Sequence, residues 1–109
     1  MKQTKLRAVS TKRAAHNEAY RDLIDKLFHE AMPCSEWDGT VEISYGHYVL
    51  EPHHIDGRRG KRLLDPFNII LLTPEQHRTF QAHNSWEVRQ ALKLWVYGLR
   101  IQQGFVPND

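Results

Sequence analysis

Four side chains in the middle of the chain have the types and the order that metal-assisted cleavage of a phosphodiester needs. His53 and His54 are adjacent, Asn68 follows a basic segment, and His77 follows an apolar one. Histidine has the unperturbed side-chain pKa nearest neutrality, which suits a base that takes a proton from water. A divalent metal can neutralise charge on a phosphate and on its leaving oxygen, and an asparagine can hold the intervening backbone in place. These residues therefore indicate hydrolysis of a phosphodiester.

Two strands and a capped helix are expected to position these four side chains. Residues 47–55 are strand-like, and the apolar residues 68–72 form a short buried strand that opens with the asparagine. Thr73 begins a capping box, with proline next and glutamine three residues on, ahead of a helix expected over 74–82. A hairpin brings the ends of its two strands together, and the helix would pack across them. The last histidine lies in the first turns of this helix.

The flanking segments predict a strand and two further helices. Apolar residues recur at helical spacing up to Pro33, residues 41–45 alternate as a strand does, and Gly98 follows a second helical pattern. The chain is therefore expected to be one α+β domain over 1–109, with a flexible basic arm at 1–10, a helix at 11–31, a ββα core at 47–83 and a C-terminal helix at 85–98.

Composition limits the class of protein. A chain of 109 residues with 40% hydrophobic and 26% charged residues is typical of one soluble domain. It has no apolar run of the length that a membrane span needs, so no membrane association is expected. Cys34 is the single cysteine, which excludes an internal disulfide and a four-cysteine zinc site. We therefore expect a cytoplasmic protein, and we interpret the three tryptophans as core residues.

Basic residues are concentrated in two places, although the formal net charge is only +2. No acidic residue occurs before residue 18, where five lysines and arginines lie close together. The second cluster lies between the two strands of the expected hairpin and consists of Arg58, Arg59, Lys61 and Arg62. Such clusters bind a phosphate backbone with release of counterions, and we expect the second one to contact DNA. The alternative is that both are solvated segments without a partner.

These residues together resemble the HNH signature of the ββα-metal, or His-Me finger, nucleases. The resemblance covers residues 50–83 and rests on Pro-His-His-Ile-Asp-Gly-Arg from residue 52, Asp-Pro-Phe-Asn-Ile-Ile-Leu-Leu from residue 65, and Glu-Gln-His from residue 75. It implies that His54 is the general base and that Asn68 fixes the loop and the base. It also implies that His53 and His77 bind the metal, although the roles of the two adjacent histidines could be exchanged.

The resemblance implies a hydrolase, specifically an endonuclease that binds one divalent metal and leaves 5′-phosphate and 3′-hydroxyl ends on DNA. Magnesium is the usual metal, with manganese, nickel and zinc as alternatives. Small stand-alone members occur in phages and bacteria, where a homodimer or a protein partner would supply specificity. The alternative is a catalytically weak or inactive DNA-binding accessory protein for recombination, packaging or regulation.

Two details depart from the family pattern or extend it. Many HNH proteins carry paired cysteines that bind a structural zinc, and here they are missing. Glu51 lies two residues before His53 and would face the same side of the strand, where it could support the metal. His83 is six residues after His77, which rotates it away from the site, and we interpret it as a surface residue.

Overall fold

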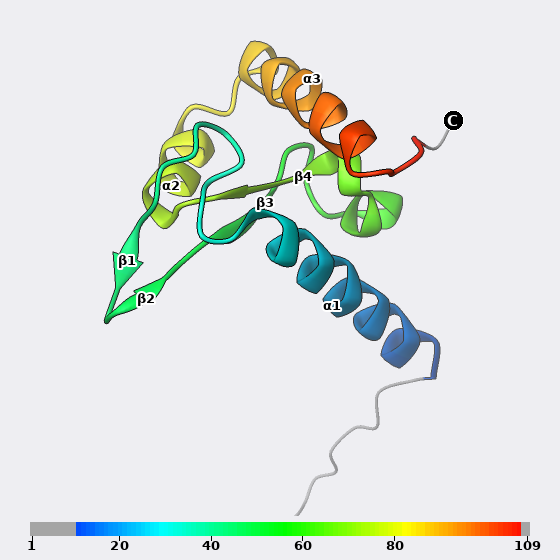
Figure 1. Ribbon diagram of the computed structural model, residues 1–109. Coiled ribbons are helices and arrows are strands. Elements are labelled where there is room, and N and C mark those ends of the chain that lie inside the picture. Colours follow the sequence, from blue (N-terminus) through cyan, green and yellow to red (C-terminus); the bar gives the residue numbers. More distant parts are fainter. Residues whose placement is uncertain (1–10, 108–109) are drawn as a thin grey trace, which may run out of the picture.

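The centre of the molecule is an antiparallel pair of strands, β3 (Glu51–His54) and β4 (Ile69–Leu72), which Figure 1 shows between two long helices. A computed structural model describes residues 11–107, so the basic arm expected at 1–10 lies outside the described residues. Within this range the chain is a small α+β domain with three α-helices and two small antiparallel sheets. None of these helices is long and apolar enough to cross a membrane.

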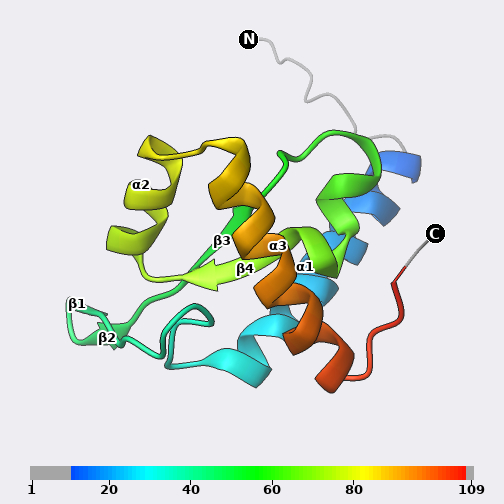
Figure 2. The same ribbon diagram turned by 90° about the horizontal axis from the view of Figure 1, so that it is seen from above.

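The strand β4 is buried on both of its faces, which explains why all four of its residues are apolar. Ile70 and Leu72 pack with Leu92 and Val96 of the helix α3 (Trp86–Gln102). The alternate residues, Ile69 and Leu71, pack with Leu27 of the helix α1 (Thr11–Ala31). Figures 1 and 2 accordingly show α1 and α3 on opposite sides of the β3–β4 pair. The strand pair therefore forms the middle layer of the domain.

The prediction of one strand over residues 47–55 is wrong in one respect, because the segment is divided between two sheets. Its first part, β2 (His47–Tyr48), pairs with β1 (Ile43–Ser44), whereas its second part is β3. Leu50 lies between the two parts and is buried in the core beside α1. Its burial directs the chain from one strand partner to the other, which the β-forming tendency of the segment could not indicate.

The β1–β2 hairpin is closed by two residues with positive φ, Tyr45 at 50° and Gly46 at 80°. A two-residue loop with both φ values positive matches the twist of a hairpin. The strand expected over 41–45 is consequently shorter than predicted, because Tyr45 belongs to the turn.

The capping box predicted at Thr73 is confirmed at the start of α2 (Pro74–Ala82). The Thr73 hydroxyl accepts a hydrogen bond from the Gln76 backbone at 3.1 Å, and the Gln76 side chain accepts one from the Thr73 backbone at 3.2 Å. These bonds satisfy two amide groups that the helix itself cannot pair. They set the direction in which α2 leaves β4.

The helix expected at 85–98 continues to Gln102, so Gly98 does not end it. Arg100 is fully buried one turn from the real end, where its guanidinium donates to the Pro66 and Ile69 carbonyls at 2.9 and 2.8 Å. These tertiary bonds outweigh the low helix propensity of one glycine. The helix ends at Gln102, and Gly104, whose φ is 93°, follows in a Schellman motif closed by the bond from the Phe105 amide to the Arg100 carbonyl.

Glu36 joins three parts of the fold. Its carboxylate pairs with Arg100 at 2.7 Å and accepts a hydrogen bond from the Leu71 amide at 2.9 Å. Its own amide donates to the Leu71 carbonyl at 2.9 Å. The loop after α1 is thereby held to the outer edge of β4, and α3 is held to both.

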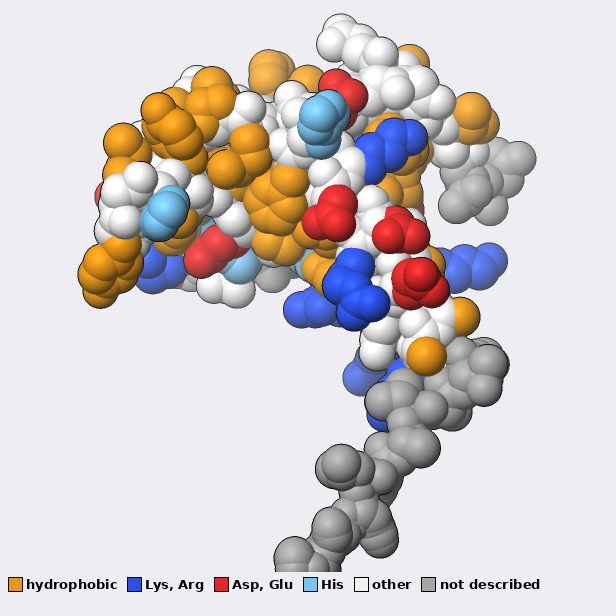
Figure 3. Space-filling model, turned by 60° about the horizontal axis from the view of Figure 1, so that its bottom comes forward, with side chains coloured by type: hydrophobic (Ala, Val, Ile, Leu, Met, Phe, Trp, Pro, Cys, Tyr) orange, Lys and Arg blue, Asp and Glu red, His pale blue; other side chains and the backbone are white. Residues whose placement is uncertain are grey.

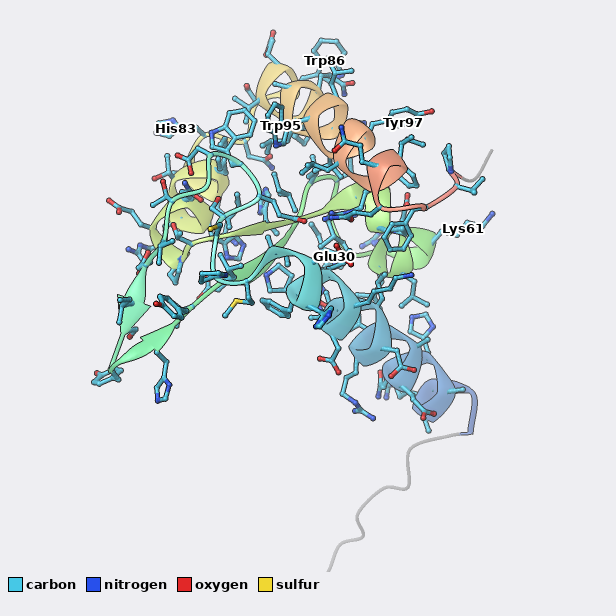
Figure 4. All side chains as sticks on the ribbon, viewed as in Figure 1. Glu30, Lys61, His83, Trp86, Trp95 and Tyr97 are labelled. Atoms are coloured by element: carbon cyan, nitrogen blue, oxygen red, sulfur yellow. The ribbon has the colours of Figure 1, made fainter. Side chains whose placement is uncertain are left out.

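We expect Glu36→Ala to lower the free energy of unfolding by about 3–5 kcal/mol, because Arg100 would stay buried without its partner. Urea denaturation monitored by circular dichroism measures this difference. The matched control is Glu30→Ala, since Glu30 is an exposed carboxylate on α1 (Figure 4). Equal stability of the two variants would contradict a structural role for the ion pair.

Candidate active site

The three histidines singled out in the sequence, His53, His54 and His77, line one cleft of about 840 Å³. Its walls come from the end of β3, the loop that follows it, α2 and the first turns of α3. Adjacent residues of a strand face opposite sides, and His53 indeed lies against α2 while His54 lies against α1. Both nevertheless reach the cleft, because β3 ends at His54 and the chain turns there.

His53 is a buried neutral imidazole beside His77. Its side chain is 5% exposed, and its ring centre lies 5.1 Å from that of His77 at an interplanar angle of 70°. Burial, together with the neighbouring His77 and His54, lowers the pKa of His53 to about 4. The Nε2 atom of His53 is buried and has no hydrogen-bond partner in the described structure. A neutral ring with an unused nitrogen is the form of histidine that binds a metal.

Glu51 orients the second imidazole of this pair. Its Oε1 atom lies 2.8 Å from Nδ1 of His77. A carboxylate only accepts hydrogen bonds, so Nδ1 donates and the Nε2 atom of His77 keeps a free lone pair when the ring is neutral. Glu51, which was expected on the same side of the strand as His53, therefore contacts His77.

His54 has the surroundings of a base. Burial and the charge of Arg58 lower its pKa to about 4, and a hydrogen bond to the Leu63 backbone partly opposes them. Because Nε2 has no partner, we assign the bond to Leu63 to Nδ1. The Tyr20 ring of α1 is stacked on the imidazole with 5.9 Å between centres, and the Arg58 guanidinium lies over Tyr20 at 5.5 Å. The imidazole is thus fixed on one side, and its Nε2 lone pair is unused.

Asn68 holds together the loop that joins β3 to β4. Its side-chain oxygen accepts from the Asp56 amide at 2.8 Å, and its side-chain nitrogen donates to the Gly57 and Arg62 carbonyls at 2.8 and 3.0 Å. Its backbone oxygen accepts from the Ile55 amide at 2.8 Å. Asn68 ends a short 3₁₀ turn, Pro66–Asn68, so the expectation that it opens the strand is wrong by one residue. Proline and the Asp65 cap favour that turn.

Four basic side chains line the cleft, but only two belong to the predicted cluster. Arg58 and Arg62 line it, whereas Arg59 and Lys61 are exposed and do not. The other two are Arg89 and Lys93 of α3, which sequence analysis missed because they are distant in sequence. Both bind Asp56, at 3.5 Å from Arg89 and 2.8 Å from Lys93. Asp56 therefore holds the loop to α3.

The basic character of the cleft contrasts with another face of the molecule. Figure 3 shows acidic and basic side chains side by side along α1. The exposed charged residues there include Glu18, Arg21, Asp22, Asp25 and Lys26. A mixed surface of this kind attracts a polyanion less than a cleft lined by four cations and one carboxylate.

The potential metal ligands of the cleft form a pair rather than a larger cluster. Across residues 11–107 no group of three or more histidine, cysteine, aspartate and glutamate side chains is arranged to hold an ion. His53 and His77 do form a pair whose nitrogens can serve as two ligands, and the unpaired Nε2 of His53 supports this. Cys34, the single cysteine of the chain, is an exposed free thiol.

Comparison of the chain with protein-family models, with curated proteins and with solved structures finds no match in any of the three. The resemblance to HNH nucleases therefore rests on the motif residues alone.

Several residues that line the cleft or contact its histidines carried no signal in the sequence. Tyr20 is one apolar position of a helical stripe, and nothing in that stripe distinguishes it from a core residue. Gln81, Asn84 and Trp86 line the cleft because α2 and the start of α3 border it. His83 is exposed and does not line the cleft (Figure 4), as expected of a surface residue.

The two histidines with low pKa values make folding depend on pH. Between pH 6.5 and about 4 the unfolded chain binds protons at His53 and His54 that the folded chain does not. Stability rises with pH wherever the unfolded state binds more protons. We therefore expect the full stability of the metal-free protein above pH 6.5 and a loss as the pH falls toward 4, measured by urea denaturation in EDTA. His54→Gln should reduce the slope and the exposed His29→Gln should not; equal slopes would contradict the assignment.

We expect Asn68→Ala to lower the free energy of unfolding by about 1–3 kcal/mol, since it leaves an amide and two carbonyl groups without partners. The loop should lose order before the rest of the molecule does. Amide hydrogen exchange should become faster at residues 56–62 and change little in α1. Uniform faster exchange throughout the molecule would show that Asn68 supports the core rather than the loop.

Proposed function

We propose that this protein is a metal-dependent endonuclease of the HNH type, which hydrolyses DNA phosphodiester bonds. In this proposal β3, β4 and α2 are the two strands and the helix of a ββα-metal unit. The observation that carries it is the juxtaposition of an unused Nε2 atom on His54 with the His53–His77 pair in one basic cleft.

His54 is the general base of the proposed reaction. Its Nε2 lone pair takes a proton from water, and the water oxygen forms a bond to phosphorus. The bond from phosphorus to the 3′ oxygen breaks, and that oxygen takes up a proton from solvent. The hydrogen bond from the ring to Leu63 and the stacking on Tyr20 hold the imidazole in one orientation and one tautomer.

His53 and His77 would hold one divalent metal. When bound, such an ion acts as a Lewis acid on the phosphate and the leaving oxygen. Magnesium is the physiological candidate, and nitrogen ligands also accept manganese, nickel or zinc. Glu51 keeps Nε2 of His77 available as a ligand. Arg58 and Arg62 line the same cleft and would bind the phosphate groups of the DNA.

Cleavage of supercoiled plasmid tests the proposal. The purified protein is incubated with magnesium, manganese, nickel, zinc or EDTA, and nicked and linear products are measured. We expect metal-dependent cleavage that His54→Ala reduces about 10²-fold to 10⁴-fold, the usual contribution of a general base. His29→Ala is the matched control, because His29 is an exposed histidine outside the cleft.

Two outcomes would contradict the proposal. Cleavage by His54→Ala at the rate of the unaltered protein would assign the activity to another residue or to a contaminant. Absence of cleavage with every metal, together with salt-sensitive DNA binding, would favour the alternative of a DNA-binding accessory protein.

A further inference from the structure

Trp86 is the one tryptophan of the three whose position the packing of the described chain does not explain. Trp37 packs edge-on against Phe80 and Trp95, with ring centres 5.6 and 5.8 Å apart. The indole nitrogen of Trp95 donates to the Glu36 carbonyl at 2.7 Å. Trp86 is 63% exposed, and within residues 11–107 its ring has no stacking or hydrogen-bond partner. The interpretation of all three tryptophans as core residues is therefore wrong for Trp86 and also for Trp95, which is 48% exposed although it has a ring contact and a hydrogen bond.

This exposed ring borders the cleft that contains the histidines. Figure 4 shows Trp86 in the first turn of α3, extending away from the body of the molecule. His77 and Gln81 are four residues apart on α2, so they lie on one face of that helix. The chain then passes Asn84 and reaches Trp86, and all four residues line the cleft. The wall of the cleft thus leads from a histidine to an aromatic ring.

Near Trp86 the cleft wall carries amide groups, from Gln81, Asn84 and Gln90. Arg89 also lines the cleft, and its guanidinium donates to the Asn84 carbonyl at 2.7 Å. Each amide has donors and an acceptor, which can bond to the edges of a nucleobase. The cations that line the cleft nearer the histidines, Arg58 and Arg62, can bind the backbone instead. A flat ring, amides and cations in one groove are the elements of a single-strand binding surface.

We propose that Trp86 and these amides form a stacking site for an unpaired nucleobase, so that the cleft takes single-stranded or locally unpaired nucleic acid in preference to closed duplex. This inference rests on the proposed function and specifies its substrate. Every base has an aromatic face on which an indole can stack, and that face is covered in a paired and stacked duplex. Base stacking on Trp86 would place the chain along the wall that leads to His77 and the other histidines.

Binding measured without cleavage tests the inference. The full chain carrying His54→Ala is titrated in EDTA, at fixed salt, against a labelled single strand of about twelve nucleotides. The same sequence closed into a duplex is the second ligand. We expect tighter binding to the single strand, and we expect Trp86→Ala to weaken that binding roughly 5-fold to 150-fold. Trp86→Phe should retain most of the affinity, because it keeps an aromatic face.

Leu94→Ala is the matched control, since Leu94 is 77% exposed on the same helix and does not line the cleft. Stacking should also quench tryptophan fluorescence, and Trp86→Phe should remove that quenching. The inference is overturned if Trp86→Ala binds the single strand as well as the parent does, or if Leu94→Ala weakens binding equally. Tighter binding of the duplex than of the single strand by the His54→Ala parent would overturn it as well.

Failure of the stacking site can be distinguished from failure of the proposed nuclease function. Plasmid cleavage with unchanged binding by Trp86→Ala would leave the nuclease and remove the stacking site. Single-strand binding that depends on Trp86, without cleavage in any metal, would leave the stacking site and remove the nuclease.

Discussion

The burial of β4 on both faces is the constraint on which the rest of the structure depends. A strand that packs against α1 on one side and α3 on the other must be apolar at every position. The observed register sets Glu51 opposite Leu72 and His54 opposite Ile69. It consequently brings Asn68, which precedes β4, beside the backbone that follows His54. The loop that Asn68 holds is therefore positioned by packing many residues away from it.

Packing also buries the imidazole nitrogens of His53 and His54. Their Nε2 atoms have no hydrogen-bond partner in the described structure. Polar atoms that lose contact with water usually find hydrogen-bond partners, and exceptions in a folded protein call for an explanation. Nε2 of His53 and Nε2 of His54 are two such exceptions, and both belong to residues that line one cleft. Burial lowers the pKa of each ring, so both nitrogens keep lone pairs at neutral pH. An ion, a water molecule or a substrate could satisfy these atoms, which is the physical basis of the functional proposal.

Charge pairing divides the cations of the cleft into two groups. Arg89 and Lys93 bind Asp56, so they stabilise the contact between α3 and the loop. Arg58 lies over the Tyr20 ring, which in turn stacks on His54. One arginine, one tyrosine and one imidazole thus form a layered group in which α1 takes part. This arrangement links the first helix of the chain to the proposed base, although the HNH resemblance covers neither α1 nor α3.

The sequence by itself determined those features whose cause is local. The Thr73–Gln76 capping box and the apolar period of α1 depend on neighbours within a few residues, so they could be predicted. The order of His53, His54, Asn68 and His77 is read directly from the sequence. Only the folded chain shows where the strand partner changes at Leu50, why α3 continues past Gly98, and which residues of α3 line the cleft. Each of these depends on contacts between segments far apart in the chain, such as Arg100 with Glu36 and Tyr20 with His54. Local propensities are worth up to about 1 kcal/mol, and a buried core or ion pair outweighs them, so only the folded chain shows which contact prevails.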